Sequence, residues 1–143
     1  MLRYRPFAPG VVVRAAGAVD DAQLEKALAA ARVTATPVRF SVGSRQPCLE
    51  RAGARVVVES DEAFAAGWAE GNGPTGASSA GGVRLRLLGA TAPVVYEAAA
   101  VAGLDVLDEP VCSCGRIELV RWLREQVVTR SLHRYGSVVY ARW

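Results

Sequence analysis

Residues 10–33, GVVVRAAGAVDDAQLEKALAAARV, contain a strand signal followed by a well-marked helix start. Residues 10–16 are a β-branched run bounded by glycines, which predicts a buried strand. Asp20 follows as a helix N-cap, and Gln23 lies three positions on, as in a capping box. The helix then repeats apolar side chains on one face, at Leu24, Ala27, Leu28 and Ala31.

The same alternation continues along the chain. Strands are predicted at 37–43, 55–59, 83–88 and 104–107. Helices are predicted at 46–52, after the Ser60 cap, and between Thr91 and Gly103. We expect a last helix at 116–127, with Leu119, Val120, Leu123 and Val127 facing inward and Glu118, Arg121, Arg124 and Glu125 facing solvent. A terminal strand or tail is expected at 137–143.

Alternating strands and helices require a mostly parallel sheet with helices on both faces. We therefore predict an α/β fold: a Rossmann-like, doubly wound sheet of about five to six strands in one domain, residues 1–143. Residues 71–82 (GNGPTGASSAGG) are expected to form a flexible Gly/Ser loop, and the break after Glu70 is where the strand order is expected to reverse.

The composition argues against several classes of protein. The chain is 51% apolar with a net charge of +3, and Lys26 is its only lysine. Its arginines are spread along the chain, which argues against a nucleic-acid module. The longest apolar run near the N-terminus, residues 11–13, is too short for a membrane span. An odd count of three cysteines favours a reduced, cytoplasmic protein.

A nucleotide site would lie where turns 16–20 and 88–91 meet, at the carboxyl ends of two strands. A dinucleotide fingerprint needs several glycines, and the first turn offers one. Asp20 and Asp21 then stand where a pyrophosphate would bind, and they would repel it. We expect no working dinucleotide site here, although a degenerate or working NAD module remains the alternative.

No other catalytic or metal site is indicated. Cys112, Cys114 and His133 supply too few ligands for structural zinc. Ser78 and Ser79 do not lie in a Gly-x-Ser-x-Gly elbow. The sequence therefore predicts no catalytic residue, no bound cofactor and no metal ligand.

The C-terminal part carries a resemblance. GRIELVRWLREQVVTRSLHRYGSV, residues 115–138, resembles the C-terminal end of long bifunctional proline-utilisation enzymes, which fuse proline dehydrogenase to Δ1-pyrroline-5-carboxylate (glutamate semialdehyde) dehydrogenase. The distinctive pattern is LREQ at 123–126 followed by HRYG at 133–136. LRYRPFAPGVVVRAAG, residues 2–17, is also similar to the start of that family's extra domain. Ser137 stands where the family usually has asparagine.

The resemblance implies a non-catalytic domain of the aldehyde dehydrogenase superfamily. It implies that this domain packs over the cavity through which the intermediate passes, as part of a longer cytoplasmic oxidoreductase that uses FAD and NAD. The partners implied are the other domains of that enzyme, with a homodimer also possible. The family's catalytic glutamate turn has its nearest match at 87–90, where Leu87 stands in the glutamate's place.

The C-terminal tail motif, residues 128–143, is then expected to contribute a contact surface. Arginine and tyrosine are favoured at interfaces. The alternative is a plain turn in which a backbone carbonyl satisfies His133. Arg121 and Glu125 are expected to form an i,i+4 ion pair. The candidate interface residues are Arg124, His133, Arg134, Tyr135 and Gly136. Edge pairing between copies has three candidate segments, at 11–14, 56–58 and 138–140.

Overall fold

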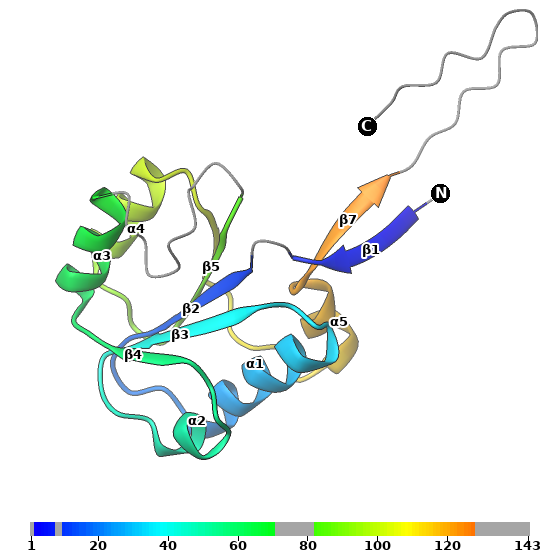
Figure 1. Cartoon of the computed structure of the whole chain (residues 1–143), viewed down its shortest axis with the longest axis horizontal. Coiled ribbons are helices and arrows are strands. Elements are labelled where there is room, and N and C mark those ends of the chain that lie inside the picture. Colours follow the sequence, from blue (N-terminus) through cyan, green and yellow to red (C-terminus); the bar gives the residue numbers. More distant parts are fainter. Residues whose placement is uncertain (1, 8–9, 71–81, 128–143) are drawn as a thin grey trace, which may run out of the picture.

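The computed structural model describes residues 2–7, 10–70 and 82–127, which form a parallel sheet with helices on both faces and a two-stranded antiparallel ribbon (Figure 1). The parallel strands are β2 (Val11–Ala15), β3 (Val38–Val42), β4 (Val56–Val58), β5 (Arg84–Leu88) and β6 (Asp105–Leu107). The helices are α1 (Asp21–Val33), α2 (Pro47–Arg51), α3 (Asp61–Ala69), α4 (Pro93–Val101) and α5 (Gly115–Val120). The ribbon pairs β1 (Leu2–Pro6) with β7 (Leu123–Val127).

The strand order in the parallel sheet is β4-β3-β2-β5-β6. The chain builds outward from β2 to β4, then crosses back through α3 to place β5 on the other side of β2. The order therefore reverses between β2 and β5, as predicted from the break after Glu70. The predicted α/β, doubly wound fold is confirmed.

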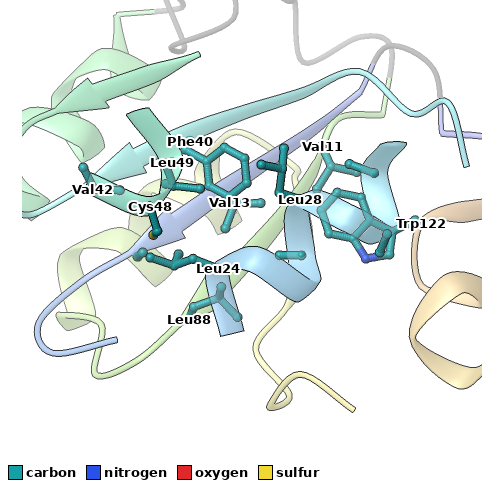
Figure 2. Close-up of a cluster of buried hydrophobic side chains, with 14 of the residues drawn as sticks. Val11, Val13, Leu24, Leu28, Phe40, Val42, Cys48, Leu49, Leu88 and Trp122 are labelled. Carbon is teal, nitrogen blue, oxygen red and sulfur yellow. The ribbon is translucent and has the colours of Figure 1, made fainter. Parts of the chain in front are cut away.

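Two apolar layers cover the sheet. On one face, Val11 and Val13 of β2 pack with Leu24 of α1 and with Trp122, as Figure 2 shows. On the other face, Val12 packs against α3 and α4. Because β2 is central, successive side chains of this strand enter opposite layers, and all five of its residues are buried.

The helix starts follow the predicted chemistry. The Asp20 side chain caps α1 by accepting a hydrogen bond from the Ala22 amide. The Ser60 side chain caps α3 by accepting one from the Ala63 amide. Each cap satisfies a backbone donor that has no partner inside its helix.

The last helix was predicted wrongly. It ends at Val120, and the second half of the predicted helix is β7 instead. Val120 and Val127, predicted to face inward, are 52% and 66% exposed. The Trp122 carbonyl oxygen accepts hydrogen bonds from the Phe7 amide and the Thr36 hydroxyl, which turns the chain out of the helix and toward β1.

The edges of the sheets also differ from expectation. The segment 11–14 lies in the central strand and cannot pair with another copy, whereas β4 is an edge strand of the parallel sheet. The candidate edge 138–140 lies outside the described residues, as do residues 71–81 of the Gly/Ser loop.

Among the helices of the described part, none has the length and apolar character to cross a bilayer.

Candidate functional site

Two turns meet at the carboxyl edge of the parallel sheet, the position at which doubly wound folds bind nucleotides. They are the predicted turns, 16–20 after β2 and 88–91 after β5. The Ala16 amide donates to the Leu88 carbonyl oxygen at 3.2 Å. Gly89 has a φ of +79°, and a Cβ atom there would lie 2.5 Å from the Ala16 carbonyl oxygen. The turns are therefore in direct contact, and glycine alone permits this approach.

The N-terminus of α1 lies beside the first of these turns. A helix N-terminus ordinarily attracts phosphate through its free amides. Here Asp20 Oδ1 accepts from the Ala22 amide at 3.1 Å, and Asp21 occupies the first helical turn. Two carboxylates, and an amide already bonded to one of them, therefore occupy the position at which a pyrophosphate would need a positive electrostatic potential.

A buried arginine lies on the opposite face of β2. Arg14 is 1% exposed, and its Nε and Nη2 donate to Asp61 Oδ1 at 2.9 and 2.6 Å. Its Nη1 donates to Ser41 Oγ at 2.8 Å, and its Nη2 also donates to the Glu59 carbonyl oxygen at 3.1 Å. The guanidinium carbon lies 5.3 Å from the centre of the Phe64 ring. Every guanidinium nitrogen already has a partner within the chain.

Asp61 also joins the two halves of the fold. Its Oδ2 accepts from the Ala92 amide at 3.1 Å, so one carboxylate connects the start of α3 with the start of α4. Together with the Gly89 contact, this bond joins the elements on the two sides of the strand-order reversal. The absence of a working dinucleotide site stays a prediction.

The cysteines occupy two different settings. Cys48 is buried in α2. This burial raises the pKa of its thiol, and the nearby Asp21 carboxylate raises it further. Cys112 and Cys114 lie in the turn before α5, and His133 is outside the described residues. Within residues 2–7, 10–70 and 82–127, no three side chains of the metal-binding types lie close together.

The ribbon carries the described part of the predicted interface. Its register places Arg5 opposite Arg124 and Arg3 opposite Gln126. Because opposed residues of an antiparallel pair share a face, the three arginines lie together on one side. Tyr4 and Val127 belong to the other side, where they are 51% and 66% exposed. In Figure 1 the ribbon extends away from the parallel sheet. Of the predicted interface, His133, Arg134, Tyr135 and Gly136 lie outside the described residues.

A cleft of about 600 Å³ lies at the base of the ribbon. Arg84 lines this cleft: its guanidinium carbon is 4.3 Å from the centre of the Phe7 ring, and its Nη2 is 2.6 Å from Asp105. Arg84 Nη1 also donates to the Arg121 carbonyl oxygen at 2.5 Å, just before β7 begins. These contacts attach the ribbon to the sheet. Other residues lining the cleft are Tyr4, Gly82, Val120, Leu123, Arg124 and Glu125.

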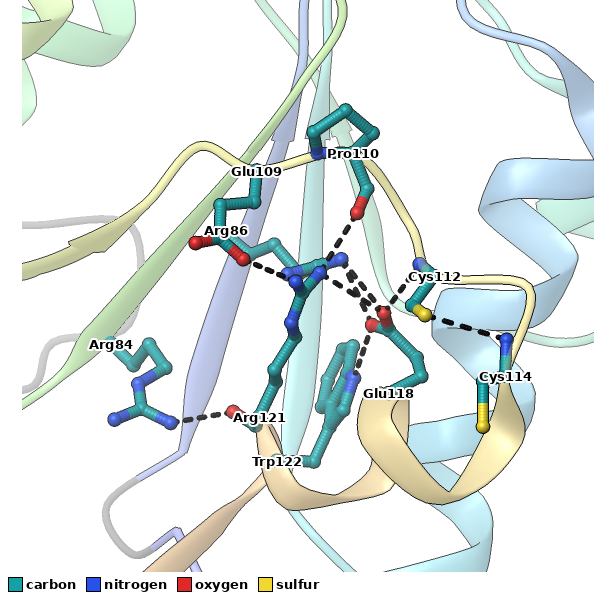
Figure 3. A network of polar contacts seen from close by, with 9 residues as sticks. All are labelled: Arg84, Arg86, Glu109, Pro110, Cys112, Cys114, Glu118, Arg121 and Trp122. Atoms are coloured by element: carbon teal, nitrogen blue, oxygen red, sulfur yellow. Dashed lines mark hydrogen bonds and ion pairs between the residues drawn. The ribbon is translucent and has the colours of Figure 1, made fainter.

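Glu118 is the centre of a second buried network, shown in Figure 3. It was predicted to face solvent and is instead 3% exposed. Glu118 Oε1 lies 2.9 Å from Arg86 Nη2 and accepts from Trp122 Nε1 at 3.1 Å. Its Oε2 accepts from the Cys112 amide at 2.9 Å. The network joins β5, the turn before α5, and the start of β7.

The predicted i,i+4 pair between Arg121 and Glu125 is absent from the described part of the chain. Arg121 instead forms ion pairs with Glu109 and Glu118 and donates to the Pro110 carbonyl oxygen at 2.8 Å. The reason is that Glu125 lies on β7 and not one helical turn after Arg121.

No protein-family profile, curated protein or solved structure matches this chain. The resemblance of the C-terminal motif to the proline-utilisation enzymes therefore stays a prediction.

Sequence reasoning missed both buried arginines. The signal that could have indicated them is an arginine inside a buried strand. Arg14 lies within a β-branched run, and Arg86 lies within RLRLL, a strand covered on both faces. A buried arginine almost always needs a carboxylate partner. The partners Asp61 and Glu118 lie 47 and 32 residues away, so the sequence pattern does not identify them.

The register of β1 against β7 can be tested by a charge substitution. Arg5 and Arg124 are like charges directly opposite each other, an arrangement that destabilises an antiparallel pair. Replacing Arg5 by glutamate creates an attractive pair, and we expect hydrogen exchange of the β1 and β7 amides to slow by about two- to fivefold. Arg39→Glu, on β3, is the control and leaves ribbon exchange unchanged. Unaltered exchange in Arg5→Glu would contradict the register.

Proposed function

We propose that this chain is a non-catalytic accessory domain of a proline-catabolic enzyme, one that joins proline dehydrogenase to glutamate semialdehyde dehydrogenase. In this role the domain covers the cavity of the intermediate and contacts other domains or subunits. The observation that carries the proposal is the close packing at the point of strand reversal. The Gly89 turn packs on Ala16, and Asp61 connects α3 to α4, where an active relative would admit its cofactor.

The ribbon supports a role in contact. A two-stranded ribbon is only marginally stable by itself in water, and this one presents exposed Tyr4 and Val127. Exposed aromatic and apolar side chains on such an element are favourable when a partner covers them. The ribbon therefore has the properties of a docking arm for the catalytic domains.

Charge distinguishes the two ends of the sequence from the rest of the chain. Segments 2–6 and 123–143 contain a single acidic residue, Glu125. Their basic residues are Arg3, Arg5, Arg124, Arg130, Arg134 and Arg142. The remainder of the chain has more acidic than basic residues, so the positive net charge comes from these segments. An acidic surface on the partner would complement them.

The cofactor test is thermal unfolding with and without NAD. We expect 1 mM NAD to leave the melting midpoint unchanged within about 1 °C. A working site with a dissociation constant near 10 μM would add about 2.7 kcal/mol, which for a domain of this size raises the midpoint by roughly 8–10 °C. A rise of several degrees would overturn the proposal and establish the alternative, an NAD-binding module.

The contact role is tested in the coupled reaction. The enzyme that contains this domain is assayed for conversion of proline to glutamate, and the lag before steady state is measured. The double variant Arg5→Glu with Arg124→Glu is expected to lengthen the lag because the intermediate escapes, while each half-reaction keeps its rate. Lys26→Glu, on α1, is the matched charge-reversal control. An unchanged lag in the double variant would count against docking through the ribbon.

A further inference from the structure

Two cysteines lie side by side in the turn that leads into α5. Cys114 is the N-cap residue of α5 and is exposed, and Cys112 is partly buried. The Cys114 amide donates to Cys112 Sγ at 3.4 Å. In Figure 3 the Cys112 sulfur points at the backbone of residue 114, and the Cys114 sulfur points away from it.

We propose that Cys112 and Cys114 are a dithiol site that closes to an intramolecular disulfide by exchange with a small-molecule disulfide. The Cys112 sulfur already lies against the backbone of residue 114, and residues 113–114 form a bend. Closure requires the Cys114 side chain to turn toward Cys112 and the two Cα atoms to lie within the roughly 4.4–6.8 Å that a disulfide spans. This site is independent of the proposed contact function.

The pair is accessible, in contrast to the third cysteine. Cys112 borders a shallow, mainly apolar cleft of about 270 Å³ between α1 and α5, and Cys114 is exposed beside it. Cys48 is 4% exposed within the core, and burial raises the pKa of its thiol. A small disulfide reagent therefore reaches the pair and not Cys48.

The exchange balances as two successive displacements. The thiolate of one cysteine attacks a sulfur of glutathione disulfide, forming a mixed disulfide and releasing one glutathione thiolate. The thiolate of the second cysteine then attacks the protein sulfur of that mixed disulfide and releases the other glutathione. The two cysteines lose two electrons and two protons, and one glutathione disulfide becomes two reduced glutathiones.

The disulfide is expected to be easily reduced. A ring closed over a single intervening residue is strained, and strained or exposed disulfides are the labile ones. Closure also reaches the Glu118 network, because the Cys112 amide donates to Glu118 Oε2, and Glu118 Oε1 holds the Trp122 indole. Tryptophan fluorescence is therefore expected to report the change.

The test exposes the folded protein to 1 mM glutathione disulfide and determines its mass intact and after proteolysis. The expected product has lost two hydrogens, carries a Cys112–Cys114 bridge, changes tryptophan fluorescence, and reopens in about tenfold excess of reduced glutathione. Cys48→Ser should behave identically. Cys114→Ser should stop at the mixed disulfide on Cys112, with no closure.

Three outcomes would overturn the proposal. One is a stable glutathione adduct on Cys112 or Cys114 in the unsubstituted protein, which means that the second sulfur cannot reach the first. Another is a bridge that includes Cys48. The third is no reaction of the folded protein while the unfolded protein does react.

Discussion

Replacement of Glu118 by alanine is expected to destabilise the domain by about 3–5 kcal/mol, because it leaves Arg86 as a buried charge without its ion-pair partner. Arg86 is 1% exposed, and burial lowers the pKa of its guanidinium, which is the cost of removing the charge from water. Among the described residues its Nε and Nη1 have no hydrogen-bond partner. The Glu118 carboxylate is therefore the main source of stabilisation for this charge.

The loss extends beyond the ion pair. The same carboxylate accepts from Trp122 Nε1 and from the Cys112 amide, both of which would lose a partner. Trp122 directs the chain into β7, so we expect ribbon amides to exchange faster in Glu118→Ala as well. Urea unfolding followed by far-ultraviolet circular dichroism measures the free energy, and hydrogen exchange measures the ribbon.

Two further variants test whether the loss of stability comes from the unpaired Arg86 charge. Glu97→Ala, on the exposed surface of α4, is the matched control and should cost less than about 0.5 kcal/mol. The double variant Arg86→Met with Glu118→Leu should be more stable than Glu118→Ala, because an apolar pair removes the uncompensated charge. A Glu118→Ala protein that loses under 1 kcal/mol would show that this network does not hold β5, α5 and β7 together.

The local parts of the fold were predictable because their signals are local. Asp20 and Ser60 begin helices by capping amides two and three positions away. Apolar periodicity identified the strands of the parallel sheet, and the break after Glu70 gave the point of strand reversal. Capping and periodicity act within a few residues, so one sequence is sufficient to read them.

The ribbon was not predictable in the same way. Residues 116–127 satisfy a helical pattern, yet β7 pairs with β1 from the opposite end of the chain. The hydrogen bond from the Thr36 hydroxyl to the Trp122 carbonyl oxygen spans 86 residues. Long-range bonds of this kind override local propensity, and nothing in the periodicity of 116–127 indicates them.

Replacement of Gly89 by alanine is expected to cost about 3 kcal/mol or more, since two penalties add at this position. The left-handed backbone alone costs about 1–2 kcal/mol for a residue with a Cβ atom. That atom would also lie 2.5 Å from the Ala16 carbonyl oxygen and 2.8 Å from Val19 Cγ2, so the turns after β2 and β5 must separate. Urea unfolding of the two proteins measures the difference.

Gly103→Ala separates the two penalties. Gly103 has a similar φ of +64°, but a Cβ atom there meets nothing within 4 Å, so this variant should cost only the backbone part, about 1–2 kcal/mol. The difference between the variants measures how tightly the two turns pack. Equal losses would mean that the contacts of Gly89 with Ala16 and Val19 add no stability, which would remove the packing argument for the proposed accessory role. A clear excess in Gly89→Ala would show that the fold depends on the close packing of these two turns.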